Sequence, residues 1–279
     1  MLAKPGFRLD RRVFLVLPAL AVSLGLFIYP VGALLLRSLF EPVPGIQNYR
    51  AVVTQPVYAA TLWNTVVISA SVTAICIVIG YPFAYAIASA GPRARRWLIF
   101  AVLVPFWSSV LVRSFAWLVL LQRNGLVNQT LIALGLTDRP LLLTHNRTGV
   151  LIGMSHVLLP FMVLPLYAVM ARIDSSYMKA AASLGAPPVR SFIRIYLPLT
   201  RAGLLNGATL VFVLGLGYFV VPALLGGAGE TMIAQLIQSQ VSDFGNWGLA
   251  GALSVVLLAA VAAAFALLRF VVPSAARAR

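Results

Sequence analysis

Long apolar runs alternate with shorter polar segments along the whole chain. An α-helix needs about 20 predominantly apolar residues to cross a bilayer, and six runs reach that length. The runs are Val13–Leu36, Leu62–Ala88, Trp97–Leu121, Gly149–Met170, Gly203–Leu225 and Gly248–Val271. The pattern therefore predicts an all-α, polytopic membrane protein with six transmembrane helices.

The composition agrees with this pattern. The chain has 279 residues, of which 61% are hydrophobic and only 10% are charged. A soluble domain carries about 25% charged residues, so the composition excludes an ordinary soluble protein. The first run is longer than the apolar core of a signal peptide and continues past Pro30, so we expect it to be retained as a span. The one cysteine, Cys76, lies inside an apolar run and cannot form a disulfide within the chain.

The basic residues predict the orientation in the membrane. A net charge of +15 would suggest nucleic-acid binding in a soluble protein, but here the lysines and arginines fall mainly in alternate loops. With both termini inside the cell, the inner segments hold 15 of the 21 basic residues and the outer loops hold 5, while Arg113 lies within a span. Because cytoplasmic loops carry the excess of Lys and Arg, both termini are predicted to be cytoplasmic, and no nucleic-acid partner is expected.

The stretch 174–200 is the longest polar-leaning segment between two apolar runs, and it is predicted to form two helices with a sharp corner between them. Asp174 or Ser175 can cap the start of the first helix. Gly185 is placed to end it in a left-handed conformation, and Pro187–Pro188 prevents its continuation. A second short helix is expected from Pro188 to Tyr196, ending before Pro198. By the orientation above, this stretch lies in the cytoplasm.

The motif in this stretch resembles a known one. The pattern Ala180-Ala181-x-x-x-Gly185, followed by Ile195-x-Leu197-Pro198, is similar to the coupling loop of bacterial ABC importer permeases. The resemblance implies helices that dock into a groove of a cytoplasmic ATPase subunit. The family usually has Glu where this chain has Lys179, which affects any polar contact made there but not the helix–corner–helix shape. The alternative is an ordinary basic cytoplasmic loop. The implied coupling residues are Lys179, Ala180, Ala181, Leu184, Gly185, Arg190, Ile195, Leu197 and Pro198.

Other segments between about residues 60 and 270 resemble the polyamine-type permeases of the same family, a branch associated with spermidine, putrescine and other small amino- or carboxylate-bearing solutes. The segments are Pro105–Trp107, Arg113–Trp117, Asn124–Asn128, Leu159–Tyr167 and Gly217–Gly227.

The resemblance implies the type I ABC importer permease architecture in a bacterial inner membrane. It further implies a similar but distinct second permease, two ATP-binding subunits, a periplasmic solute-binding protein and transport by alternating access. Residues 1–61 would form the cytoplasmic head, first helix and periplasmic loop, residues 62–271 the core permease domain, and residues 272–279 a cytoplasmic tail.

The sequence offers little for catalysis on this chain. The glycine-rich segment Gly226–Thr231 lacks the Lys and spacing of a phosphate-binding loop, so ATP and Mg²⁺ are expected on a partner ATPase. His145 and His156 are too few for a metal site, and no acidic residue lies in a span to complete a catalytic triad. We expect no catalytic residue, metal or cofactor on this chain. A membrane-embedded enzyme and an autonomous channel are the competing classes, and the second would not need a coupling loop.

Arg113 is the one charged residue well inside a predicted span. An ionisable residue within the membrane is a candidate functional residue. If Arg113 faces the translocation path, it would bind a carboxylate or phosphonate group of the solute. The alternative is that Arg113 extends to the outer interface or braces a neighbouring helix. Trp107 either lines the same path or belongs to the interface.

The fifth run carries a predicted break. Gly215, Gly217 and Pro222 interrupt it, and broken helices often mark substrate sites in transporters. Tyr218 and Phe219 at this break would then border the solute path, while close helix packing through small residues is the alternative. All six acidic residues lie outside the predicted spans, which argues against a strongly cation-selective interior. An amino acid, an opine or a phosphonate is the alternative solute to a polyamine.

Overall fold

The computed structural model describes residues 11–271, and within them the chain is helical without any strand. Six helical segments are long and apolar enough to span a membrane, so the predicted all-α, six-span class is confirmed. They are Leu17–Phe40, Pro56–Ser89, Val110–Ala133, Arg147–Met170, Pro188–Leu216 and Trp247–Ala266.

The described residues form two compact units, one of residues 11–54 and 237–256 and one of residues 55–236 and 257–271. The predicted division after residue 61 stays a prediction, and the tail 272–279 lies outside the described residues.

The first unit begins with three successive helical elements, α1 (Arg11–Ser23), a π-helical turn η1 (Leu24–Ile28) and α2 (Tyr29–Phe40). A short helix α3 (Gln47–Thr54) follows. The side-chain amide of Asn48 donates to the carbonyl oxygens of Ser38 at 2.9 Å and Glu41 at 2.7 Å. The guanidinium of Arg37 lies 5.0 Å above the ring of Trp247, at the start of α14 (Trp247–Val271). Polar side chains thus fix the end of α2.

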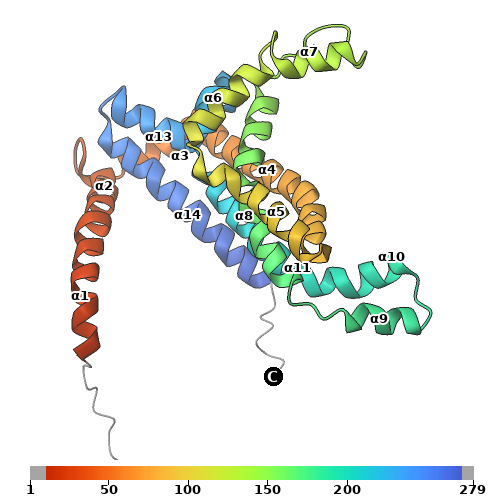
Figure 1. Ribbon diagram of the computed structural model, residues 1–279. Coiled ribbons are helices and arrows are strands. Elements are labelled where there is room, and N and C mark those ends of the chain that lie inside the picture. The colour runs from red at the N-terminus through yellow and green to blue at the C-terminus, as the bar shows by residue number, and fades with distance from the viewer. Residues whose placement is uncertain (1–10, 272–279) are drawn as a thin grey trace, which may run out of the picture. The chain divides into compact units, whose positions relative to one another are not determined.

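The second unit is built on three helices, α4 (Pro56–Ser89), α8 (Arg147–Met170) and α11 (Leu197–Leu216), which pack on one another (Figure 1). Glycines permit this close approach. A Cβ on Gly207 would lie 3.0 Å from the carbonyl oxygen of Met162, and one on Gly203 would lie 3.1 Å from the Cα of Leu166. Small residues at helix contacts are typical of membrane proteins, where backbones must come together without a hydrophobic driving force.

The third predicted span is two helices rather than one. Helix α5 (Pro92–Leu103) passes into a 3₁₀ turn η2 (Val104–Trp107), and α6 (Val110–Leu121) begins after an extended Ser108–Ser109. Pro105 removes a backbone donor at this point, and the chain leaves helical geometry at the next turn. Helix α7 (Leu126–Ala133) follows α6 after a short turn.

The fifth predicted span starts earlier than expected and breaks where expected. After α9 (Ser176–Ser183), α10 (Pro188–Ser191) continues through a π-helical turn η3 (Phe192–Tyr196) into α11, so the prediction that the second short helix ends before Pro198 was wrong. Residues 217–219 leave the helix, and α12 (Val220–Leu225) follows, which confirms the predicted break. The remaining elements are η4 (Ala228–Glu230) and α13 (Ile233–Ser242).

Candidate functional site

Residues 174–200, here called the coupling segment, form the predicted corner. Gly185 has a φ of +77°, the left-handed conformation that favours glycine. The N–H of Ala186 donates to the carbonyl oxygen of Ala181 at 3.0 Å, and that of Gly185 donates to Ala182 at 2.9 Å. This pair of bonds is the Schellman motif, which ends α9 and turns the chain toward α10.

Of the two residues predicted to cap α9, Asp174 bonds the first turn through its side chain, whereas Ser175 at the N-cap position does not. The carboxylate of Asp174 accepts the backbone N–H of Ser176 at 2.8 Å. This hydrogen bond favours the ionised form and lowers the pKa of the Asp174 carboxyl below its ordinary value. Because the folded pKa is lowered, the cap is fully formed at neutral pH and is lost only as the carboxyl protonates in acid.

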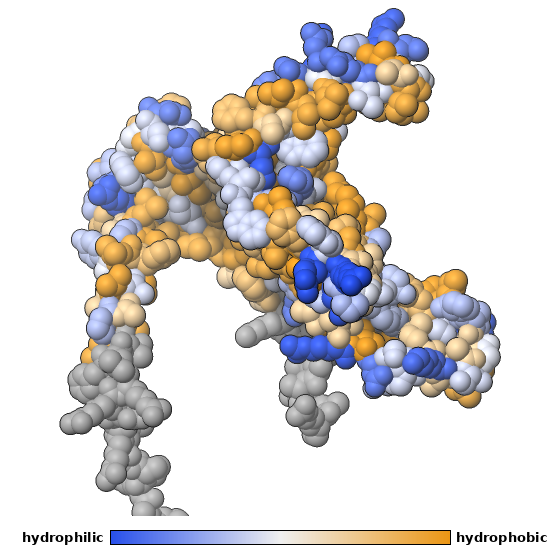
Figure 2. Space-filling view, viewed as in Figure 1, coloured by the Kyte–Doolittle hydropathy of each residue, from blue (hydrophilic) through white to orange (hydrophobic). Residues whose placement is uncertain are grey.

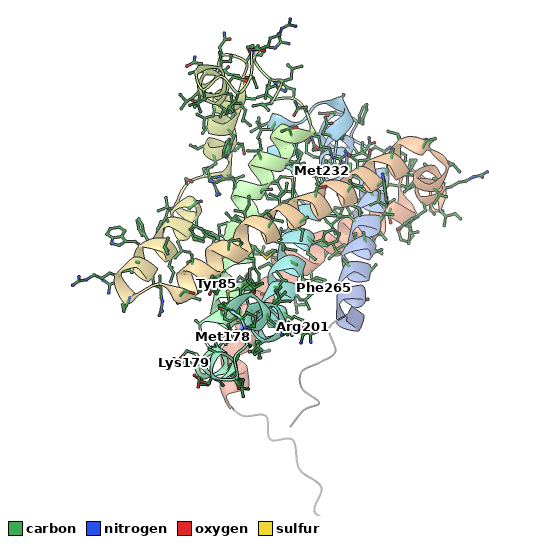
Figure 3. All side chains as sticks on the ribbon, turned by 90° about the vertical axis from the view of Figure 1, so that its right-hand side faces the viewer. Tyr85, Met178, Lys179, Arg201, Met232 and Phe265 are labelled. Atoms are coloured by element: carbon green, nitrogen blue, oxygen red, sulfur yellow. The ribbon has the colours of Figure 1, made fainter. Side chains whose placement is uncertain are left out.

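The two faces of α9 differ. Met178 and Ala181 face the rest of the unit: Met178 packs against the cluster that contains Ala84 and Tyr196, and Ala181 is only 6% exposed. In Figure 3, Met178 lies on the side of α9 toward Tyr85 and Lys179 on the far side. The prediction that Ala181 faces a partner groove therefore needs correction, since its small side chain lets α9 lie against its own chain.

The outer face of α9 carries an exposed apolar stripe of Tyr177, Ala180 and Leu184, which are spaced to share one face of a helix. Leu184 is 88% exposed. Val189 and Ile193 are also exposed, so apolar and basic side chains mix over the coupling segment (Figure 2). Of the other predicted coupling residues, Lys179, Arg190 and Pro198 are exposed, and Ile195 and Leu197 are half-buried.

An aromatic cluster that the sequence analysis missed joins the coupling segment to α4. Phe192 of η3 makes edge-to-face contacts with Tyr81 and Tyr85 at centroid distances of 6.1 Å and 5.7 Å, and it stacks on Tyr196 at 5.6 Å. Tyr85 also meets Tyr196 edge-to-face at 5.3 Å. Each pair of rings on one element is spaced four residues apart, a helical periodicity that could have revealed the cluster.

A cavity of about 330 Å³ lies where the two broken spans meet. The 3₁₀ turn and first turn of α6 supply one part of its wall, the break after α11 supplies Tyr218, and α8 closes it. Arg113 and Tyr218, both predicted path residues, thus line one cavity. The lining residues are Phe106, Ser108, Val110, Arg113, Val157, Leu158, Phe161, Leu214 and Tyr218.

The other predicted path residues lie elsewhere. Trp107 is 72% exposed and is not part of the cavity wall. Gly215 is buried against α4, where an added Cβ would lie 3.1 Å from the Oγ of Ser69, so it serves packing. Gly217 and Phe219 flank Tyr218 in the break without lining the cavity.

Arg113 has no compensating charge at this site. Its Nε is buried and has no hydrogen-bond partner among the described residues. The cavity wall contains no acidic side chain, and its polar groups are the hydroxyls of Ser108 and Tyr218. Arg113 as a whole is half-exposed, so its contact with the cavity favours the path role while the interface and bracing alternatives stay open.

A second, more apolar cavity of about 440 Å³ lies between α4, α6 and α8 and includes Cys76, Trp117 and His156. The indole N–H of Trp117 donates to the Nδ1 of His156 at 3.2 Å. No group of three His, Cys, Asp or Glu side chains able to hold a metal ion is found in residues 11–271.

The chain resembles known transport proteins over most of its length. Residues 77–277 match the family model described as the binding-protein-dependent transport system inner membrane component. The chain is 37% identical to the spermidine/putrescine transport system permease protein PotB of Haemophilus influenzae, over 75% of this chain and 73% of that protein. It is 35% identical to PotB of Escherichia coli, over 76% of this chain and 77% of that protein.

The fold is also shared with a solved structure. A chain of a bacterial ABC transporter involved in the import of the acidic polysaccharide alginate superposes with a TM-score of 0.71 at 19% identity, covering 94% of this chain and 96% of that chain. Family, sequence and fold agree. The chain belongs to the binding-protein-dependent transport system inner membrane components and is a permease subunit of an ABC importer.

Proposed function

We propose that this chain moves a small solute, either a polyamine or a related amino- or carboxylate-bearing compound, across a bacterial inner membrane by alternating access, driven by ATP hydrolysis on a partner subunit. Its partners are a similar but distinct second permease, two ATP-binding subunits and a periplasmic binding protein. Both termini and the coupling segment lie in the cytoplasm. The names of the PotB relatives support the solute class, and a neighbouring solved structure that includes a periplasmic protein supports that partner.

The exposed stripe Tyr177, Ala180 and Leu184 is the observation that carries the proposal. Lys179, Arg190 and Arg194 of the same segment are exposed, which argues against a place for this stretch in the hydrocarbon region of the bilayer. Outside the membrane, a contiguous exposed apolar surface is typical of a protein interface. A helix with one apolar stripe fits a groove on a partner, and an ATPase subunit of the importer is that partner.

The same elements connect the coupling segment to the cavity. Helix α10, η3 and α11 run without interruption from Pro188 to Leu216, and Tyr218 of the cavity wall follows directly. The aromatic cluster ties η3 to α4. A displacement of the coupling segment by the ATPase therefore reaches the break after α11 through one stiff helix, which is how alternating access would be driven.

Substitution at Leu184 tests the proposal. Leu184→Asp places a charge in the centre of the stripe, so we expect the ATPase subunits to be lost on purification through a tag on this chain and solute uptake to fall to background. Leu136→Asp is the matched control, because Leu136 is 66% exposed in the loop after α7, on the opposite side of the predicted topology. Normal ATPase recovery and uptake with Leu184→Asp would refute the docking role of the stripe.

A further inference from the structure

We infer that the cavity at the two helix breaks is a carboxylate site, in which Arg113 binds the carboxylate of a small solute with an apolar body. That this solute is the transported one rests on the proposed function. Binding of a carboxylate in the cavity does not depend on the proposed function. It can be measured on this chain alone.

The charge of Arg113 is the first argument. A guanidinium stays protonated in a protein, and an unpaired cation in an apolar environment is costly. The five acidic residues that the structure describes all lie outside the candidate spans. Three of them have partners nearby: Glu41 pairs with Arg37 at 3.6 Å, Asp174 accepts from Ser176, and Glu230 accepts the N–H of Gly227 at 3.1 Å. No acidic side chain lines the cavity, so a bound carboxylate would supply the counter-charge for Arg113.

The donors around the cavity favour an anion as well. Arg113 lies in the first turn of α6, whose free backbone N–H groups form the positive end of the helix dipole. Ser109, at the N-cap position, makes no side-chain cap there. A planar guanidinium binds a carboxylate through two parallel hydrogen bonds, and the hydroxyl of Tyr218 can donate a further one, whereas that of Ser108 already donates to the carbonyl oxygen of Pro105 at 3.1 Å.

The remaining residues of the cavity wall determine what kind of ligand body fits beside the carboxylate. Val157, Leu158, Phe161 and Leu214 present apolar surface, which suits a short hydrocarbon chain and offers nothing to a second charge. The volume of about 330 Å³ is at the small end of ligand sites. A diamine such as putrescine would place a like charge beside Arg113, whereas butyrate has a carboxylate at one end of a short hydrocarbon chain and no second charge. The cavity should therefore bind the carboxylate compound in preference to putrescine.

Cysteine accessibility tests this inference without any partner subunit. Ser108→Cys is introduced into a Cys76→Ala background, and the purified chain in detergent is treated with an anionic reagent (sulfonatoethyl methanethiosulfonate) or a cationic one (trimethylammonioethyl methanethiosulfonate). We expect the anionic reagent to be favoured, and Arg113→Gln to lower the ratio of the two rates by roughly tenfold, since a unit charge has gone from beside the thiol. Arg113→Lys should retain most of the preference. Arg123→Gln, an exposed arginine after the end of α6, should leave the ratio unchanged.

The same thiol then reports ligand binding. Butyrate should slow modification of Ser108→Cys, putrescine at equal concentration should not, and the protection should vanish in Arg113→Gln. The inference is overturned if the rate ratio is insensitive to Arg113→Gln, if putrescine protects as well as butyrate, or if neither protects. Loss of ATPase docking in Leu184→Asp bears only on the proposed function, so the two failures can be distinguished.

Discussion

Ala180 and Ala181 are neighbours with the same side chain and opposite surroundings. Ala180 belongs to the exposed stripe of α9, while Ala181 is buried against its own chain. The sequence cannot separate them, because a run of three alanines carries no polarity that would mark the inner face. Gly185 and Asp174 were predictable, because a left-handed turn and a helix cap depend on residues within one turn of the chain.

A bulky residue should therefore have different effects at Ala180 and at Ala181. Ala181→Trp overpacks the contact between α9 and its own unit, so we expect a loss of about 1–3 kcal/mol in stability, seen as a lower Tm of the purified chain. Ala180→Trp should leave Tm unchanged and weaken ATPase recovery instead. An equal Tm for the two variants would contradict the assigned faces.

Helix breaks that have a local cause were predictable from the sequence, whereas helix ends that depend on packing were not. Gly215, Gly217 and Pro222 correctly predicted the break between α11 and α12. The continuity of α10 with α11 was missed because proline usually ends a helix, whereas here the π-helical turn η3 widens the backbone just before Pro198 and accommodates its ring. The same arrangement precedes Pro30, where η1 leads into α2.

The aromatic cluster of Tyr81, Tyr85, Phe192 and Tyr196 can be tested by substitution. Phe192→Leu removes three ring contacts, each worth about 0.5–1.5 kcal/mol beyond its buried area, while retaining an apolar side chain. We expect the ATPase subunits to remain bound, uptake to fall several-fold and ATP hydrolysis to become less dependent on solute. The control is Phe244→Leu, since Phe244 is 72% exposed. Wild-type uptake with Phe192→Leu would show that the cluster serves packing alone.

The distribution of basic residues along the chain predicts the orientation of the whole molecule in the membrane. It assigns 15 of 21 basic residues to the cytoplasmic side. It says nothing about the cavity, because Ser108, Arg113 and Tyr218 meet there only through the packing of α6, α8 and the break after α11. Topology depends on local charge, whereas a site made from distant segments depends on the fold.

The topology has a direct test in intact cells. Ser242 and Ser183 are both exposed on the chain itself, and the predicted orientation places them on opposite sides of the membrane. In a Cys76→Ala background, a membrane-impermeant thiol reagent should label Ser242→Cys from outside and reach Ser183→Cys only after the membrane is permeabilised. Labelling of Ser183→Cys alone would reverse the orientation.

The π-helical turn η3 also bears on how the two ends of this long helix can move. Such a turn holds one residue more than an α-helical turn, and one residue of α-helix corresponds to a rotation of about 100° and a rise of about 1.5 Å. If that extra residue were absorbed into regular helix, the coupling segment would swivel about the axis of α11 and shift along it without any bend. Phe192 and Tyr196 both lie in this turn, so their rings hold the helix at one angular setting, and a swivel must first separate them from Tyr81 and Tyr85.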